Sequence, residues 1–372
     1  MSIIEYSSPG FIPRTLVAGF DLDWTLIKTT SGRIHPKTPS DWMLHNQNVV
    51  HTLKQLHASG YAICIFTNQE GVTKGRITQA ELIEKFEAIQ HVFNIPCLFM
   101  AAIRNDEYRK PRTAMWRKIQ TEWFAQSEIN IDVAKSLYVG DAAGRPRTLN
   151  RKADFNDTDY KFALNIGVGR FEVPETFFKL TEAVPHRSLW SVHIPSAFSP
   201  SSFVQTRVSE TIIGISTESP VLWLCMGPPA AGKTTFCKQQ AKTIQWINQD
   251  TLKTQKHCLA NARTCLEQSQ SCIVDGTHRT VKARATYLQL AKEQNVPCKC
   301  LWFDQTKEVV FHLNTFRLLT GGSYVPDVAI HSYFKRVECP TEDEGFAEII
   351  KIPWVAKFES KEAQTLCGKY LR

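Results

Sequence analysis

Short apolar segments alternate with longer helical patterns between residue 15 and about residue 170. The runs TLVAGF (15–20), YAICIF (61–66) and SLYV (136–139) have the length of strands, whereas residues 78–93 carry apolar positions at helical spacing. Thr78, followed three residues later by Glu81, predicts a capping box at the start of that helix. This alternation predicts an α/β fold in which helices cover both faces of a parallel sheet.

Polar side chains follow each of these apolar runs. They are Asp21 and Asp23 after the first run, Thr67 and Asn68 at the end of the second, and Asp141 after the third. Ligands of parallel sheets bind beyond the carboxyl ends of the strands, so we expect these side chains to converge. Two aspartates one residue apart suit a divalent metal and a phosphoryl-transfer site that needs a nucleophile and an acid/base. A solvated turn is the alternative for this motif taken alone.

The composition of the chain changes between residues 183 and 220, which are rich in Ser and Pro and show no sustained hydrophobic periodicity. We expect a linker there. Strand-like runs resume with VLWLCM (221–226), IQWIN (244–248), CIVD (272–275) and CKCLWF (298–303). The sequence therefore predicts two α/β domains, residues 1–182 and 221–372, joined by the linker 183–220.

The second domain opens with GPPAAGKTT (227–235), which fits the phosphate-binding loop pattern between a strand and a helix. We expect its backbone N–H groups to cradle the phosphates of ATP, Lys233 to reach the β- and γ-phosphates, and the Thr234 hydroxyl to bind Mg²⁺. The expected nucleotide-binding residues are Gly227, Ala230, Ala231, Gly232, Lys233, Thr234 and Thr235. A plain Gly/Pro-rich turn is the alternative.

Three further residues are candidates for the chemistry of the second domain. Asp250 and Asp275 stand at strand ends, where one can accept the proton of an attacking hydroxyl while the other organises Mg²⁺ or the acceptor; helix capping is the alternative for each. Arg317 is a candidate to stabilise charge on the phosphates, and an ordinary surface arginine is its alternative.

Composition and charge bound the function further. The 372 residues are 43% hydrophobic and 22% charged, with a formal net charge of +8. Between Arg104 and Lys152, eleven Lys and Arg stand against six Asp and Glu. A basic surface beside aspartates favours a nucleic-acid substrate, with a merely solvated face as the alternative. The N-terminus shows no signal peptide, no run is long enough to span a bilayer, and eleven cysteines without a CxxC pair are expected to be reduced core residues.

The order of motifs resembles one known family. DLDxT, FTNQ, YRKP, GDAAGRP, the phosphate-binding loop and N-x-D-T-L follow one another as in the bifunctional polynucleotide kinase 3′-phosphatases that repair DNA ends, and the likeness runs from about residue 14 to 358. The forkhead-associated domain of animal members has no counterpart here. The resemblance implies a haloacid-dehalogenase-like phosphatase with a Rossmann-like parallel sheet, followed by a P-loop kinase. It also implies a nuclear location, with cytoplasm or mitochondrion as alternatives, and a monomer without membrane attachment.

The resemblance further implies roles for matching residues. Asp21 would be the nucleophile that becomes an aspartyl-phosphate, and Asp23 the acid/base that protonates the leaving sugar oxygen. Thr67 and Lys110 would hold phosphoryl oxygens, while Asp141 would complete a Mg²⁺ site with Asp21 and the Asp23 carbonyl. In the kinase, Asp250 would activate a 5′-hydroxyl. The expected substrate contacts are Asn68, Arg109, Arg145, Asp275 and Arg284.

Some positions depart from the family pattern. Trp24 stands where the family usually has Gly; in the kinase half, Gln249, DGTH (275–278) and Thr315 replace polar substrate contacts. Two other functions therefore stay open: a fusion of a small-molecule phosphatase and kinase, and a non-enzymatic scaffold for DNA ends. The fusion is distinguished from an end-repair enzyme by substrate length, because it would act on mononucleotides or sugar phosphates as well as on oligonucleotide ends. The scaffold is disfavoured because Asp21, Lys110 and Lys233 are all present.

Overall fold

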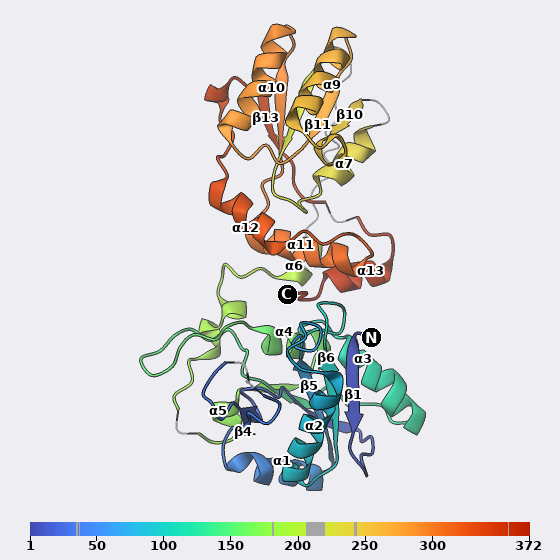
Figure 1. The fold of residues 1–372 in the computed structure, drawn as a ribbon, viewed down its shortest axis with the longest axis vertical. Coiled ribbons are helices and arrows are strands. Elements are labelled where there is room, and N and C mark those ends of the chain that lie inside the picture. Colours follow the sequence, from blue (N-terminus) through green and yellow to red (C-terminus); the bar gives the residue numbers. More distant parts are fainter. Residues whose placement is uncertain (35, 37, 181, 206–219, 242–243, 356) are drawn as a thin grey trace. The chain divides into compact units, whose positions relative to one another are not determined.

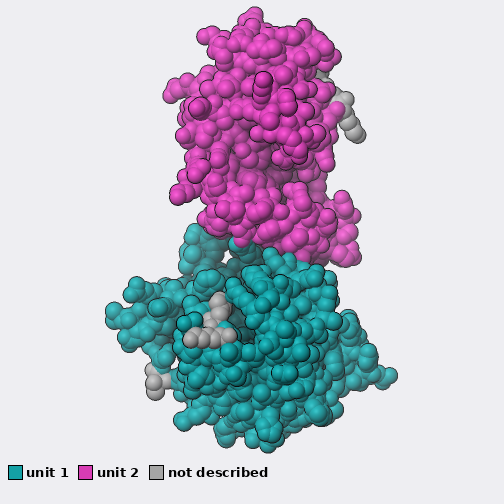
Figure 2. All heavy atoms as spheres, viewed as in Figure 1, with its two compact units in different colours: residues 1–200, 369–372 teal, residues 201–368 magenta. Residues whose placement is uncertain are grey.

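The computed structural model describes residues 1–372 except 35, 37, 181, 206–219, 242–243 and 356. The chain forms two compact units, which Figure 2 colours separately: residues 1–200 with 369–372, and residues 201–368. The predicted linker differs from this division, because Trp190 is buried in the core of unit 1. Residues 206–219 of that linker lie outside the described residues. Unit 1 also includes the last four residues, where the Tyr370 N–H donates to Asn165 Oδ1 at 2.9 Å.

Unit 1 is built around a six-stranded sheet of order β1-β6-β5-β2-β7-β8 (Figure 1). The strands are β1 (Ile3–Ser7), β2 (Leu16–Phe20), β5 (Tyr61–Asn68), β6 (Cys97–Ala102), β7 (Leu137–Val139) and β8 (Arg170–Glu172). The three predicted strands are confirmed as β2, β5 and β7, and they pair in parallel. Edge strand β1 is antiparallel to β6 and was not predicted. A separate two-stranded ribbon joins β3 (Ile27–Lys28) and β4 (Met43–Leu44).

Both faces of this sheet are buried, as the alternation along β5 shows. Ile63 and Ile65 belong to one hydrophobic core, and Cys64 and Phe66 to the other. Because successive side chains of a strand point to opposite faces, each core lies on its own side of the sheet. The first core includes residues of α1 (Asn48–Ala58) and α2 (Gln79–Phe93), and the second includes residues of α3 (Ala114–Lys118) and α4 (Thr158–Ile166).

Helix α2 begins as predicted. Thr78 is its N-cap, Thr78 Oγ1 accepts from the Glu81 N–H, and the Glu81 carboxylate accepts from the Thr78 N–H at 2.7 Å. The remaining short helical segments of unit 1 are η1 (Ile119–Phe124, π-helical), η2 (Ala125–Ser127), α5 (Pro174–Phe177), η3 (Arg187–Leu189) and η4 (Ser191–His193).

Unit 2 contains a five-stranded sheet of order β10-β11-β9-β12-β13 in which every pair is parallel. The strands are β9 (Leu222–Met226), β10 (Gln245–Asn248), β11 (Cys272–Asp275), β12 (Cys298–Trp302) and β13 (Glu348–Lys351). The four predicted strands are confirmed, and β13 was not predicted. The helices are α6 (Pro200–Gln205, which begins at the unit boundary), α7 (Lys233–Gln240), α8 (Gln249–Leu252), α9 (Gln255–Glu267), α10 (Val281–Glu293), α11 (Lys307–Leu319), α12 (Asp327–Arg336), η5 (Glu342–Glu344) and α13 (Lys361–Cys367).

Helices cover both faces of the second sheet as well. Helices α9 and α10 lie side by side (Figure 1) and pack on Leu222 and Leu224 of β9, whereas α7 packs on the opposite face against Cys225. All eleven cysteines are free thiols and all but Cys339 are buried, as expected for reduced core residues. Among the described residues, no helix is long and apolar enough to cross a membrane.

Candidate active sites

The first candidate site lies at the carboxyl end of the unit 1 sheet, around Lys110. Its ammonium donates to Asp21 Oδ1 at 2.6 Å, to Asp159 Oδ1 at 2.7 Å and to the Tyr138 hydroxyl at 3.0 Å. Lys110 is 3% exposed and Asp159 2%. This buried cation is fixed in place by two carboxylates and a hydroxyl, which together engage all three of its N–H donors, so it binds an anion only by exchanging one of these bonds.

Asp159 belongs to this site although the sequence analysis did not identify it. It lies in the first turn of α4, and its second carboxylate oxygen accepts from the Ala142 N–H at 3.1 Å. It packs so closely on Gly140 that a Cβ there would lie 2.5 Å from the Asp159 Cβ. The segment DFNDTDYKF (154–162) contains three aspartates. The third, Asp159, stands at the start of a helix that has a buried face, and this position was the signal that could have identified it.

Three carboxylates make this site a candidate for a divalent cation. Asp21, Asp141 and Asp159 each offer an oxygen, and these oxygens all lie within 4.8 Å of one another. Burial raises the pKa of Asp21 to about 7, and the charges of Asp159 and Asp23 add to the rise while Lys110 opposes it. Burial, and then the charge of Asp21, also raises the pKa of Asp141. Hard oxygen ligands whose mutual repulsion Lys110 offsets only in part fit Mg²⁺.

Thr25 positions Asp141 against the first loop. The Asp141 N–H donates to Thr25 Oγ1 at 3.1 Å, and the Thr25 hydroxyl lies 3.4 Å from Asp141 Oδ1. Thr25 is fully buried. The threonine of DLDxT therefore holds the loop after β7 beside the loop after β2, as the convergence of strand ends predicts.

Asp23 occupies the open side of the site, with its side chain 38% exposed. Gln69 Nε2 donates both to Asp23 Oδ2 at 2.7 Å and to Thr67 Oγ1 at 2.8 Å, so one amide links the two predicted residues. The buried ammonium of Lys85, from α2, lies 3.4 Å from Asp23 Oδ1. Gln69 and Lys85 were not predicted. Together they hold the Asp23 carboxylate next to, but outside, the buried aspartate cluster.

Two of the predicted substrate residues have structural partners close to Lys110. Asn68 Oδ1 accepts from the Lys110 N–H at 2.9 Å and its amide donates to the Lys110 carbonyl at 3.3 Å, so it positions the Lys110 backbone. The Arg109 guanidinium is partly exposed and lies 3.9 Å from Glu70. Arg109 thus remains available to a substrate at this edge.

The geometry corrects the prediction for Arg145. Its buried guanidinium donates to Asp154 Oδ2 at 2.8 Å, Glu175 Oε2 at 2.6 Å and the Asp141 carbonyl at 2.9 Å. These bonds hold the loop that carries Asp141, and the burial of the side chain gives Arg145 a structural role. Arg112 is likewise buried and donates to the Leu371 carbonyl. Of the predicted basic stretch, the exposed members are Arg104, Arg117, Lys135, Arg147 and Lys152.

The second candidate site is the loop 227–235 of unit 2. Gly227 has φ +155°, and a Cβ there would lie 2.7 Å from the Phe303 Cβ; Gly232 has φ +90°. Lys233 is buried and donates to the carbonyls of Gly227 and Pro228 at 2.9 and 2.6 Å. Burial lowers its pKa, and the charges of Asp275 and Asp250 oppose this. A glycine-dependent turn around a buried lysine at the start of α7 is a phosphate cradle.

Strand-end side chains of β10 and β11 meet this loop. Asp275 Oδ2 accepts from the Thr234 hydroxyl at 2.8 Å and from Asn248 Nδ2 at 2.9 Å. Asp275 is buried, whereas Asp250 is exposed at the start of α8. The arrangement joins Asp275 to the hydroxyl predicted to bind Mg²⁺, so it suits the metal-organising role, and Asp250 is the carboxylate that an acceptor can reach.

The prediction of Arg284 as a substrate contact is corrected by its surroundings. Its side chain is fully buried, and the guanidinium binds both oxygens of Glu344, at 2.7 and 2.6 Å, as well as the carbonyls of His278 and Glu338. Arg284 therefore ties α10 to η5. Arg317 is exposed on α11, and its guanidinium donates to Ser323 Oγ at 2.7 Å, so its contact with the phosphates stays a prediction.

His278 is a buried residue of the second site that was noted only as a departure. Its Nδ1 bonds the Cys225 carbonyl at 2.6 Å, while Nε2 has no partner among the described residues. Burial lowers the pKa of His278 to about 4, so the ring is neutral at pH 7.

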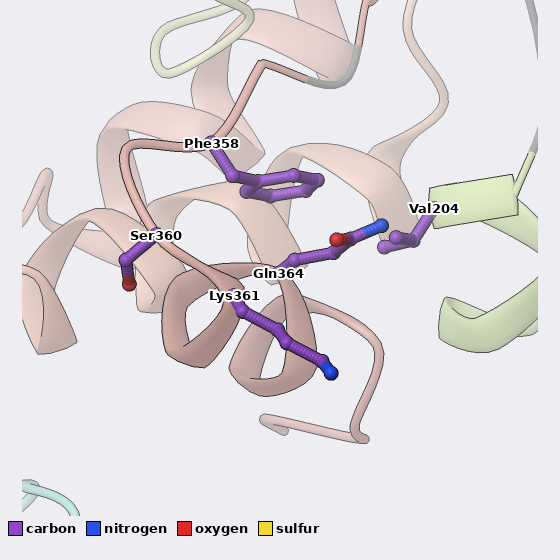
Figure 3. Close-up of a pocket in the computed structure, with 5 residues that line it drawn as sticks. All are labelled: Val204, Phe358, Ser360, Lys361 and Gln364. Carbon is purple, nitrogen blue, oxygen red and sulfur yellow. The ribbon is translucent and has the colours of Figure 1, made fainter.

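A surface hollow of about 560 Å³ also lies in unit 2 (Figure 3); none of its lining residues was predicted to act in catalysis.

The two units define a class of enzyme. A phosphatase domain, with its aspartates and lysine at the strand ends, is joined to a kinase domain that carries a phosphate-binding loop. A model of the polynucleotide kinase 3 phosphatase family matches residues 16–178, and a model of the AAA domain matches residues 222–340.

Curated relatives place the chain more closely. A bifunctional polynucleotide phosphatase/kinase of Schizosaccharomyces pombe is 34% identical over 90% of this chain and 79% of its own length. A putative bifunctional polynucleotide phosphatase/kinase of Acanthamoeba polyphaga mimivirus is 29% identical over 90% and 83%. The polynucleotide 3′-phosphatase ZDP of Arabidopsis thaliana is 33% identical over 44% of this chain and 24% of its own length. The chain belongs to the bifunctional polynucleotide phosphatase/kinase family.

Proposed function

We propose that this enzyme processes DNA ends in strand-break repair, removing 3′-phosphates and phosphorylating 5′-hydroxyls with ATP. The observation that carries the proposal is the buried contact of Lys110 with Asp21 inside a cluster of three carboxylates, in a chain that also carries a phosphate loop. A nuclear location fits this role.

In the phosphatase, Asp21 attacks phosphorus and becomes an aspartyl-phosphate. Lys110 and Thr67, which are both buried, hold the phosphoryl oxygens. Asp23, on the open side of the site, protonates the leaving 3′-oxygen and then accepts a proton from the attacking water. Asp21, Asp141 and the Asp23 carbonyl would hold Mg²⁺, which neutralises negative charge on the transferring group when bound.

In the kinase, the loop N–H groups and Lys233 hold the triphosphate of ATP. Asp250 accepts the proton of the 5′-hydroxyl as it attacks the γ-phosphate. Thr234, supported by Asp275, would hold Mg²⁺. Arg317, whose guanidinium donates to Ser323 Oγ, stabilises charge on the phosphates.

A nicked duplex with a 3′-phosphate and a 5′-hydroxyl tests both halves at once. With Mg²⁺ and ATP we expect both ends to be converted, and without ATP only the 3′ end. EDTA should stop both reactions. Failure to release phosphate from the 3′ end in the presence of Mg²⁺, whether or not ATP is added, would overturn the proposal.

A further inference from the structure

Trp24 is held in a backbone conformation that a bulky residue rarely adopts. It stands between Asp23 and Thr25, and its φ is +65°. The Trp24 N–H donates to the Ile27 carbonyl at 2.6 Å, which closes the turn. Glycine takes this conformation freely, whereas tryptophan is strained there. Strained residues at a catalytic loop persist where the side chain has a use.

Core packing does not account for the indole. Trp24 is half-buried and belongs to neither hydrophobic cluster of the described part of unit 1. Its Nε1 donates to the Ile34 carbonyl at 3.3 Å, an exposed contact with a residue that is itself 75% exposed. The bond fixes the orientation of the ring, while the apolar area of the indole is not used by the core.

Trp24 is close in sequence to two aspartates of the candidate phosphatase site. Asp23, the residue before Trp24, has a partly exposed carboxylate on the open side of the site. Asp21, two residues before Asp23, lies in the buried part of the same site. A substrate whose phosphate reaches Asp21 must pass this open side.

We infer that Trp24 is a stacking platform for the base of the nucleotide that carries the 3′-phosphate. Proteins hold single-stranded ends by stacking the bases on aromatic rings, and stacking tolerates every sequence because every base has a π-face. The inference rests on the proposed phosphatase function and adds a substrate contact: the terminal base, and not only the phosphate, is bound.

Two variants separate the ring from the backbone. Trp24→Gly removes the ring and suits φ +65°, so it should fold; Trp24→Phe keeps an aromatic face. Two 3′-phosphorylated oligonucleotides serve as substrates, one with a normal terminal nucleotide and one whose terminal nucleotide lacks its base. For the normal substrate we expect Trp24→Gly to raise KM about tenfold, equivalent to about 1.4 kcal/mol of binding, with kcat within about twofold. Trp24→Phe should stay within about threefold of wild type.

The substrate without a terminal base is the control. For it, wild type and Trp24→Gly should differ less than about twofold in KM. An unchanged KM for the normal substrate, or an equal loss on both substrates, would overturn the stacking role; the second result would mean that the indole acts on the loop alone. If wild type releases no phosphate from either substrate, the proposed function itself fails, so the two failures are distinguishable.

Discussion

Asp159 and Lys110 form a buried ion pair, with 2.7 Å between Oδ1 and Nζ, inside the phosphatase site. Lys110 is held between Asp159 and Asp21, so its ammonium keeps one fixed position beside Asp21. Asp159 acts on the reaction through Lys110 and, by its charge, on Asp21. It is a positioning residue that also contributes to the acidic cluster.

Replacing Asp159 tests this position. Asp159→Asn keeps the shape of the side chain but removes the charge that orients Lys110, so we expect phosphatase kcat to fall about 10- to 100-fold while kinase activity is unchanged. Asp132→Asn, on the surface beside Lys135, is the matched control and should leave both activities intact. A phosphatase kcat within twofold of wild type in the folded Asp159 variant would remove the residue from the site.

The raised pKa of Asp21 predicts how the stability of the metal-free protein depends on pH. Burial raises the pKa of the folded carboxyl to about 7, whereas 3.8 is its ordinary value. Between these values the folded state binds more protons than the unfolded state, so stability falls as pH rises from about 4 to about 7. Deprotonated carboxylates bind Mg²⁺, so Mg²⁺ should raise Tm more at pH 8 than at pH 5.5.

Thermal melting with and without Mg²⁺ measures this effect. Asp21→Asn is the control: it should melt higher than wild type at pH 8 without metal, because a repelling charge is gone, and should lose most of the response to Mg²⁺. A metal-free Tm that rises from pH 5.5 to pH 8 in wild type and not in the variant would contradict the assignment.

The two activities should separate by single substitutions. Lys233→Ala removes the cation from the phosphate loop, so we expect at least a 100-fold loss of kinase activity without loss of phosphatase activity. Lys238→Ala, an exposed lysine of the same helix, should keep both. Conversely, Asp21→Asn should abolish only the phosphatase. Joint loss of both activities in either folded variant would mean that the two sites are coupled.

Arg145 and Arg147 form a natural pair for testing which arginines meet the substrate. Arg145→Ala leaves Glu175 without its ion-pair partner and Asp154 with Arg151 alone, so we expect a loss of about 3 kcal/mol in unfolding free energy. Arg147 is exposed, so Arg147→Ala should leave stability within about 0.5 kcal/mol. It should lower the slope of log affinity against log salt by about 0.7 for a single-stranded end. An unchanged slope would exclude Arg147 from phosphate contact.

Much of the fold follows from local pattern. Runs such as YAICIF are long, apolar and bounded, and the Thr78–Glu81 box is a purely local signal. Strand β1 was missed because Ile3–Ser7 has no clean alternation and gains its partners from β6, far along the chain. Strand β13 likewise depends on pairing with β12.

Candidate site residues could be predicted from the sequence where they follow directly after a strand. Residues that belong to the site because of how they are buried could not. Asp21 and Asp141 stand after strands, but Asp159 enters the site from the first turn of a helix. Charge counting also cannot separate an arginine that meets substrate from one that holds the fold. Arg145 and Arg284 looked like substrate contacts, and only their buried carboxylate partners reveal the structural role.

Substrate length tests the central claim, action on polynucleotide ends, most directly. We would measure phosphatase kcat/KM for a mononucleotide 3′-phosphate and for an oligonucleotide of about ten residues, at low salt and at fourfold higher salt. With about three phosphate contacts at about −0.7 each, the oligonucleotide should lose roughly 20-fold in affinity over this range, and the mononucleotide should react poorly throughout. Equal efficiency for both substrates, with no salt dependence for the oligonucleotide, would contradict the account and favour a small-molecule phosphatase and kinase.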